Sequence, residues 1–185
     1  MTTYISMLRG INVGSQKKIR MKDLRDLYES LNFRNCQTYI QSGNVIFKFD
    51  DISSSKLSIK IEKQIKKVFG FDVPVFIRTK DELAKIIEDN PFISKENSLT
   101  KEDLKLFHVT FLSDSPAQLP IKEIDLIKNE SEKFSIVSKE IYLFLPNGYA
   151  RTKLSNGFFE KKLKVSATTR NWRTVNKLYD IAKET

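Results

Sequence analysis

The stretch CQTYIQSGNVIFKF, Cys36 to Phe49, decides how the first half of this chain is expected to fold. Its two ends predict strands, and Ser42-Gly43 separates them. Because the sequence Ser-Gly-Asn is typical of a turn with positive φ, the stretch predicts a tight two-residue β-hairpin. A conformational role therefore explains Ser42 and Asn44 more simply than a role in binding, although Asn44 is kept as a candidate ligand-binding residue.

Working outward from the hairpin, alternating strand and helix patterns flank it on both sides. Glycine at position 70 suits a left-handed helix C-cap, and Pro74 suits the edge or the start of a strand. The flanking predictions are a strand over Thr2–Ile11, an amphipathic helix over Met21–Leu31, a second helix over Ser53–Phe69 and a strand in VPVFIRT. Residues 2–79 thus predict the order βαββαβ, that of a ferredoxin-like unit with two helices on one face of an antiparallel sheet.

The same order recurs in the second half of the chain. Thr79 and Glu82 form a T-x-x-E capping box for a linking helix, and the polar stretch Phe92 to Asp103 marks a boundary. The predicted elements beyond it are a strand in LKLFHVTFL, a helix over Pro116–Lys128, strands in KFSIVS and EIYLFL, a short helix over Gly157–Leu163, a weak strand near LKVSAT and a terminal helix. The predicted fold class is α+β, with ferredoxin-like subdomains over 1–91 and 92–185, the second irregular and ending in a C-terminal helix.

Composition points to a cytoplasmic protein with a basic character. The chain has 185 residues and a net charge of +9, and a single cysteine, Cys36, cannot form an intramolecular disulfide. No apolar run approaches the roughly 20 residues that span a bilayer, and the N-terminus does not resemble a secretory signal. The excess of positive charge lies at the two ends of the chain, which could attract phosphates or carboxylates if they met in space.

Two segments at these ends predict an anion-binding site. In LRGINVGSQKK, the glycines permit close approach while Arg9, Asn12, Lys17 and Lys18 offer hydrogen-bond donors, although neither G-x-x-x-x-G-K-[ST] nor G-x-G-x-x-G is present. In TTRNWRTV, the unpaired N–H groups at the start of the final helix would be surrounded by Thr168, Thr169, Arg170 and Arg173, and Thr169 or Asn171 could cap its first turn. The alternatives are a solvated loop for the first segment and ordinary helix capping for the second.

A third basic segment, GYARTKLSNGFFEKKLK, interleaves aromatic residues with Arg151 and four lysines. Such a pattern can hold single-stranded nucleic acid by stacking and phosphate contact, although the aromatics could equally belong to the core. The candidate ligand-binding residues are Arg9, Asn12, Lys17, Lys18, Asn44, Arg151, Thr169, Arg170, Asn171 and Arg173. The expected partner is nucleic acid or a small phosphorylated or anionic ligand.

No complete catalytic motif is present. With one histidine, His108, and one cysteine, the chain lacks the residues for a zinc site of the usual type, and we expect no metal or cofactor. His108 stands in a predicted strand, which favours a core or edge histidine over a catalytic one. Two functions stay open: a binding module that presents a basic face to an anionic ligand, and an enzyme acting on a small anionic substrate in a pocket between the subdomains.

Three strings spread over the chain, LRGINVG (8–14), YIQSGNVIF (39–47) and TTRNWRTV (168–175), resemble the hallmark segments of the bacterial family called domain of unknown function 1697. The resemblance implies an α+β protein of two ferredoxin-like subdomains and implies no activity. Two positions depart from the family pattern. Ser15 stands where a further glycine is usual, and Arg173 stands where asparagine is common.

Overall fold

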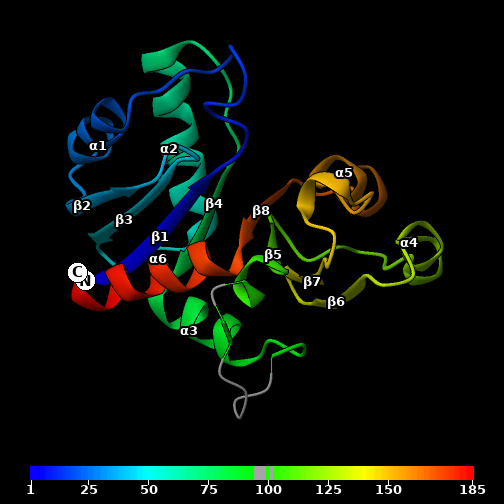
Figure 1. Ribbon diagram of the computed structural model, residues 1–185. Helices are drawn as coiled ribbons and strands as arrows, with labels where there is room; N and C mark the ends of the chain where they lie inside the picture. The colour runs from blue at the N-terminus through cyan, green and yellow to red at the C-terminus, as the bar shows by residue number, and fades with distance from the viewer. Residues whose placement is uncertain (94–98, 101) are drawn as a thin grey trace. The chain divides into compact units, whose positions relative to one another are not determined.

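The protein folds as two compact units (Figure 1). The computed structural model describes residues 1–93, 99–100 and 102–185, so part of the predicted boundary stretch lies outside the described residues. The first unit comprises Met1–Lys85 with Lys177–Thr185, and the second unit comprises Ile86–Asn176. Compared with the predicted division into 1–91 and 92–185, residues 86–91 group with the second half and the last nine residues group with the first.

The first unit is one antiparallel sheet of four strands in the order β2-β3-β1-β4. Helices α1 and α2 cover one face of this sheet (Figure 1). The elements are β1 (Thr2–Leu8), α1 (Met21–Ser30), β2 (Arg34–Tyr39), β3 (Asn44–Phe49), α2 (Ser54–Phe69), β4 (Val75–Thr79) and α3 (Lys80–Glu88), whose residues from Ile86 onward belong to the second unit. This is the predicted βαββαβ order, with β4 at the edge that Pro74 indicates.

The second unit repeats this topology. Its sheet has the strand order β6-β7-β5-β8, and all of its neighbouring strands are antiparallel. The elements are a 3₁₀ turn η1 (Asp103–Lys105), β5 (Phe107–Leu112), α4 (Ile121–Ile127), β6 (Lys133–Val137), β7 (Glu140–Phe144), a 3₁₀ turn η2 (Tyr149–Arg151), α5 (Asn156–Leu163), β8 (Ala167–Asn171) and the start of α6 (Trp172–Glu184), which from Lys177 onward belongs to the first unit. The chain is therefore an α+β protein built from two similar ferredoxin-like arrangements.

The central strand of each sheet is buried on both faces. In β1, Tyr4 and Leu8 join the apolar cluster beneath α1 and α2, while Ile5 and Met7 are buried on the opposite face. Every residue of β5 is likewise buried. Because these strands are covered on both faces, apolar residues occur at consecutive positions, and the polar side chains among them, such as Ser6 and Thr110, are buried as well.

Two predicted elements of the second half are present but have different bounds in the structure. Helix α4 starts at Ile121 rather than at Pro116, and β8 starts at Ala167, beyond the centre of the stretch LKVSAT. Thr168, Thr169 and Arg170 consequently lie in an edge strand and do not surround the start of α6. The short run ATTRN carries few apolar residues, so its pairing with β5 leaves little trace in the sequence.

The hairpin between β2 and β3 is longer than predicted. Tyr39 pairs with Asn44, so that four residues, 40–43, form the connection instead of two. Positive φ occurs at Ile40 (51°) and at Gly43 (77°), and only the glycine was expected to adopt it. A Cβ atom built on Gly43 would lie 2.5 Å from Cδ1 of Ile11 and 3.0 Å from Cβ of Leu8. The glycine is therefore required both for its backbone angle and for the close approach of these side chains.

Helix ends follow the signals in the sequence. Gly70 adopts the left-handed conformation after α2 and donates its N–H to the carbonyl of Lys66. The N–H of Thr79 donates to the Glu82 carboxylate at 2.7 Å, and the N–H of Glu82 donates to the Thr79 hydroxyl at 3.1 Å, which confirms the capping box of α3. Within the part of the chain that is described, no helix has both the length and the apolar character to span a bilayer.

We predict that Gly43→Ala destabilises the first unit by about 2–3 kcal/mol, because the left-handed backbone and the contact with Ile11 both oppose a Cβ atom. Gly70→Ala is the matched control. It has a similar φ, but nothing lies within 4 Å of its added Cβ, so a loss of only about 1 kcal/mol is expected. Urea denaturation measures both. Equal losses in the two variants would contradict the packing role of Gly43.

Candidate anion-binding site

The opening loop of the first unit, residues 9–20, is held together by Asn12. Its side-chain amide donates to the carbonyls of Ile19 (2.9 Å) and Gln41 (2.8 Å), and its carbonyl oxygen accepts the N–H of Ile19 at 2.9 Å. Asn12 also adopts a positive φ of 57°, which asparagine tolerates better than most residues. These contacts tie the loop to itself and to the β2–β3 hairpin, so the polar atoms of Asn12 are engaged inside the fold.

The basic residues of the opening loop differ in whether they form hydrogen bonds or ion pairs within the fold. The ammonium of Lys17 donates to the carbonyl of Asp72 at 2.7 Å, and Arg20 forms an ion pair with Asp23 at 2.7 Å. Arg9 is half-buried and donates its backbone N–H to the carbonyl of Pro74. Among these residues, Lys18 is exposed and forms no ion pair with any described residue. The loop therefore offers one free cation rather than a converging set.

Asn44 is fully buried at the start of β3. Its side-chain amide donates to the carbonyl of Tyr39 (3.0 Å) and to the hydroxyl of Ser42 (3.1 Å), which closes the hairpin loop. A buried amide that bridges both sides of a turn stabilises the turn and has no access to a ligand in solution. This geometry supports the conformational role expected for the Ser-Gly-Asn sequence.

The residues around the junction of β8 and α6 have separate roles. Asn171 caps α6, because its side-chain oxygen accepts the N–H of Thr174 at 2.8 Å. Arg170 is only 8% exposed and donates to the hydroxyl of Thr168 at 2.9 Å and to the carbonyl of Thr169 at 3.0 Å. Burial lowers the pKa of Arg170 to about 10, which leaves it charged at neutral pH. Arg173, in the first turn of α6, is exposed and makes no ion pair with a described residue.

Thr169 lies at the centre of a polar network that the sequence did not reveal. Its hydroxyl donates to the side-chain oxygen of Asn156 at 2.6 Å, lies 2.7 Å from the hydroxyl of Thr110 and accepts from the phenol of Tyr149 at 3.3 Å. The phenol oxygen in turn accepts the backbone N–H of Asn156 at 3.1 Å. The network fixes the connection between β7 and α5, residues 145–155, against the strands of the sheet. We call this connection the β7–α5 loop.

His108 lies under the same loop. Its ring stacks on the ring of Tyr149, with centroids 5.4 Å apart and an interplanar angle of 28°. The side chain is 8% exposed, and its buried Nδ1 has no hydrogen-bond partner among the described residues. Burial lowers the pKa of His108 from its ordinary value of 6.5 to about 4, so the imidazole is neutral at physiological pH.

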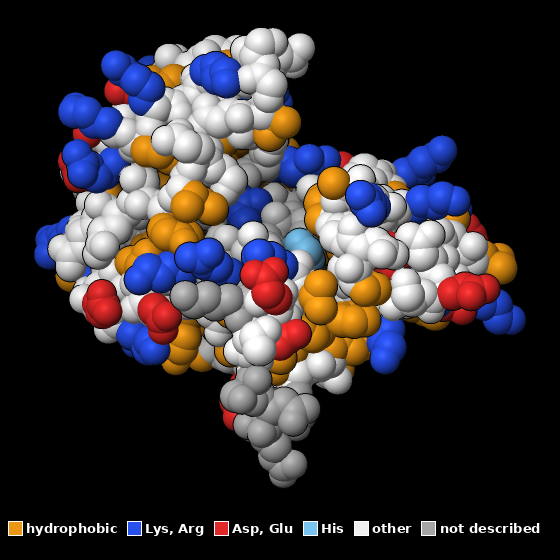
Figure 2. All heavy atoms as spheres, viewed as in Figure 1, with side chains coloured by type: hydrophobic (Ala, Val, Ile, Leu, Met, Phe, Trp, Pro, Cys, Tyr) orange, Lys and Arg blue, Asp and Glu red, His pale blue; other side chains and the backbone are white. Residues whose placement is uncertain are grey.

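The β7–α5 loop, α5 and the residue that follows α5 carry a group of five basic side chains. Lys162 pairs with Glu123, but the remaining cations are exposed and form no ion pair within the described parts of the chain. These cations are Arg151, Lys153, Lys161 and Lys164, and we call them the basic segment. Figure 2 shows Lys and Arg side chains over much of the visible face, with Asp and Glu side chains among them.

The aromatic residues of this region belong to the core. Phe159 is fully buried, and Tyr149 and Phe158 pack against the same apolar cluster. These three rings therefore do not offer exposed faces on which nucleic-acid bases could stack. The segment is therefore better interpreted as core aromatic residues beside solvated cations than as a surface that stacks single-stranded bases. Its exposed cations can still contact phosphates.

The two units differ in the loop that joins the third strand to the second helix. The connection between β3 and α2 in the first unit has four residues, 50–53, and includes Asp50 and Asp51. The equivalent β7–α5 loop has eleven residues and includes Arg151 and Lys153. Each loop is anchored by a tyrosine hydroxyl, since Tyr4 of β1 donates to the carbonyl of Ile52 at 2.8 Å. The two loops therefore differ both in length and in the sign of the charged side chains they carry.

Among the residues that the structure describes, neither a metal-binding cluster nor a reactive thiol is found. No cluster of three or more His, Cys, Asp or Glu side chains suited to a metal ion occurs among them. Cys36 is buried, and burial together with the charge of Glu29 raises its pKa to about 11. A thiol with such a pKa stays protonated at neutral pH and is a poor nucleophile.

The fold, two ferredoxin-like units with a buried polar network in the second, defines the class of the chain as an α+β protein. Residues 1–142 match the family described as protein of unknown function (DUF1697), and the chain belongs to that family. The match covers the first two of the three hallmark strings, and TTRNWRTV lies beyond it. None of the curated proteins compared with the chain matches it.

A solved structure shares the fold. It is the conserved bacterial protein SP0830 from Streptococcus pneumoniae, which is 22% identical and superimposes with a TM-score of 0.67 over 98% of each chain. At this level of identity the likeness extends to the fold and supports no inference about ligands.

The structure divides the predicted site residues between the two units. Arg9, Asn12, Lys17, Lys18 and Asn44 belong to the first unit, and the rest belong to the second. In the second unit, hydrogen bonds connect Thr169 to the β7–α5 loop that carries Arg151. Sequence reasoning missed Thr110, Tyr149 and Asn156 as members of this network, because their proximity arises only from strand pairing and loop packing.

We predict that stability falls as pH decreases from about 6.5 to about 4. The unfolded chain binds a proton on His108 below pH 6.5, whereas the folded protein does so only near pH 4, so protonation favours unfolding across this interval. The loss amounts to about 3 kcal/mol. Urea denaturation at several pH values, with His108→Gln as the comparison, tests this. If the variant keeps the full pH dependence of the native protein, His108 is not its source.

Proposed function

We propose that this protein binds a phosphate-bearing ligand, with nucleic acid as the principal form, through the basic segment of the second unit. The observation that carries the proposal is that Arg151, Lys153, Lys161 and Lys164 are exposed, close together in the sequence and without an ion pair to any residue that the structure describes. Surface cations without acidic partners are the groups that contact phosphates.

Anchoring of the β7–α5 loop supports the proposal. The hydrogen bonds of Tyr149, Asn156 and Thr169 hold the loop and the start of α5 against β8, and Tyr149 also stacks on His108 of β5, so Arg151 and Lys153 project from a fixed base. A positioned cation loses less conformational entropy on binding than one on a free tail. Ser155, which accepts the N–H of Phe158 at 3.3 Å, fixes the start of α5 in the same region.

The remaining predicted residues contribute to the proposal to different degrees. Arg173 is exposed on the second unit and extends the set of free cations. Arg170, Thr169 and Asn171 are engaged in hydrogen bonds within the fold and act by positioning. In the first unit, Lys18 is the exposed residue of the opening loop that can add a phosphate contact, while Asn12 and Asn44 maintain the loop and the hairpin.

Binding of labelled single-stranded RNA, measured by fluorescence anisotropy over a range of salt concentrations, tests the proposal. We expect affinity to fall steeply with salt, since each phosphate contact contributes about 0.7 to the slope of log K against log salt. The double variant Arg151→Gln/Lys153→Gln should lower that slope by about 1.5. The matched control, Lys56→Gln/Lys63→Gln on α2 of the first unit, removes the same charge from exposed positions and should leave the slope nearly unchanged.

Two results would contradict the proposal: binding that does not respond to salt, and equal loss of slope in both double variants, which would indicate general charge attraction. A thermal-shift screen with nucleotides and sugar phosphates addresses the alternative of an enzyme with a small anionic substrate. Saturable stabilisation by one such compound, with no binding of RNA, would favour the enzyme.

A further inference from the structure

A pocket of about 300 Å³ lies in the second unit, lined by Pro91, Phe92, Phe107, Lys133 and Phe144. Its volume falls at the lower end of the range of roughly 300–1,000 Å³ that is typical of small-molecule sites. Phe107 and Phe144 pair across β5 and β7, and Lys133 of β6 pairs with Phe144. Because side chains alternate along a strand, these three residues lie on the face of the sheet opposite to Leu143, which packs with α5.

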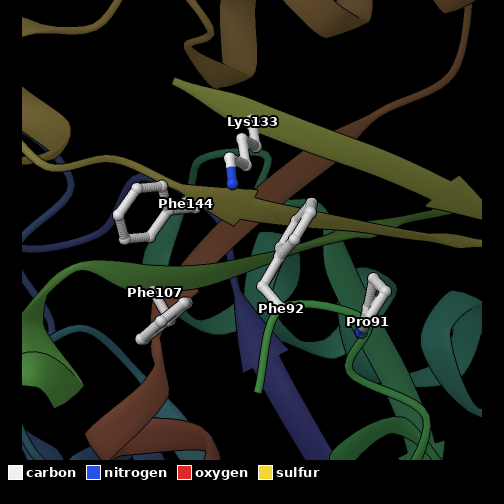
Figure 3. A pocket seen from close by; sticks show the side chains of 5 residues that line it. All are labelled: Pro91, Phe92, Phe107, Lys133 and Phe144. Carbon is white, nitrogen blue, oxygen red and sulfur yellow. The ribbon is translucent and has the colours of Figure 1, made fainter. Parts of the chain in front are cut away.

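Aromatic rings form the walls of this pocket. The rings of Phe107 and Phe144 are 5.3 Å apart between centroids and are tilted by 42°, and both line the pocket. Phe92 and Pro91 supply the remaining apolar surface (Figure 3). An apolar body of one ring, or of a branched aliphatic chain, matches such walls.

Lys133 provides the one charged group of the lining. Its Nζ lies 5.9 Å from the centroid of the Phe144 ring, and it makes no ion pair with any residue that the structure describes. Figure 3 shows the ammonium group directed between the rings of Phe92 and Phe144. An ammonium group beside an apolar cavity attracts an anion more strongly than one in open water, because the aromatic walls reduce the screening.

We propose that this pocket, which we call the phenylalanine pocket, binds a small carboxylate with an aromatic or branched aliphatic body. The body packs among Phe92, Phe107 and Phe144, and the carboxylate pairs with Lys133. A single lysine without an arginine suits a monoanion better than a phosphate, which calls for several donors. The site is separate in its residues from the basic segment, so it stands or falls independently of the proposed function.

The test uses 3-phenylpropionate as the carboxylate and 3-phenylpropionamide as its neutral counterpart. Titration of the ¹⁵N-labelled protein, followed by NMR, should show saturable shifts of the amides of Phe92, Phe107, Lys133 and Phe144 with the carboxylate. We expect the amide to bind about tenfold more weakly. Lys133→Gln should weaken binding of the carboxylate by about tenfold and leave binding of the amide unchanged, while Lys122→Gln, an exposed lysine of α4 outside the pocket, should leave both unchanged.

A second variant separates loss of binding from loss of folding. Phe92 is only half-buried and lies outside the sheet, so Phe92→Ala should keep the native NMR spectrum while weakening both probes at least tenfold. The proposal is overturned if 3-phenylpropionate shows no saturable binding up to about 10 mM, a range that would reveal a millimolar Kd. It is also overturned if the amide binds as well as the carboxylate, or if Lys133→Gln has no effect.

Discussion

In each unit, one inner strand has a neighbouring strand on either side and is covered on both faces of the sheet. The burial of this strand is the constraint on which the rest of the unit depends. Strands β1 and β5 are central in their sheets and buried along most of their length. A polar group on such a strand must find a partner inside the fold, or it destabilises the folded state. Tyr4 meets this demand by hydrogen bonding to the backbone of Ile52, whereas His108, at the equivalent position of β5, stacks on Tyr149 of a longer loop.

The difference between Tyr4 and His108 at equivalent positions of the two inner strands affects how the neighbouring surface loop is held. In the first unit, the tyrosine hydroxyl holds a four-residue loop close to the sheet. In the second, the histidine ring supports Tyr149, and the hydroxyl of Tyr149 joins Asn156 and Thr169, so the eleven-residue loop has a firm base. Loops carry function when a rigid scaffold positions them, and the β7–α5 loop meets that condition while carrying Arg151 and Lys153. The functional proposal therefore rests on a difference between two copies of one fold.

Local signals explain most of what the sequence could predict. Apolar periodicity located the strands and helices of the first unit, Gly70 marked the end of α2, and Thr79 with Glu82 marked the start of α3. The failures have physical causes. Ile40 takes a positive φ that a β-branched residue rarely adopts, so the four-residue hairpin gave no signal. Strand β8 and the network around Thr169 depend on partners distant in the sequence, and the phenylalanine pocket depends on pairing across β5, β6 and β7.

The central functional claim is that the basic segment of the second unit contacts phosphate. Its most direct test is an NMR titration of the ¹⁵N-labelled protein with a single-stranded oligonucleotide, because chemical shifts locate the contact without relying on substitutions. The account predicts that the largest shifts fall on the β7–α5 loop, on α5 and on Lys164, which together span residues 145–164, with smaller shifts near Lys18. Shifts confined to the opening loop, or a spectrum that does not change at low salt, would contradict it.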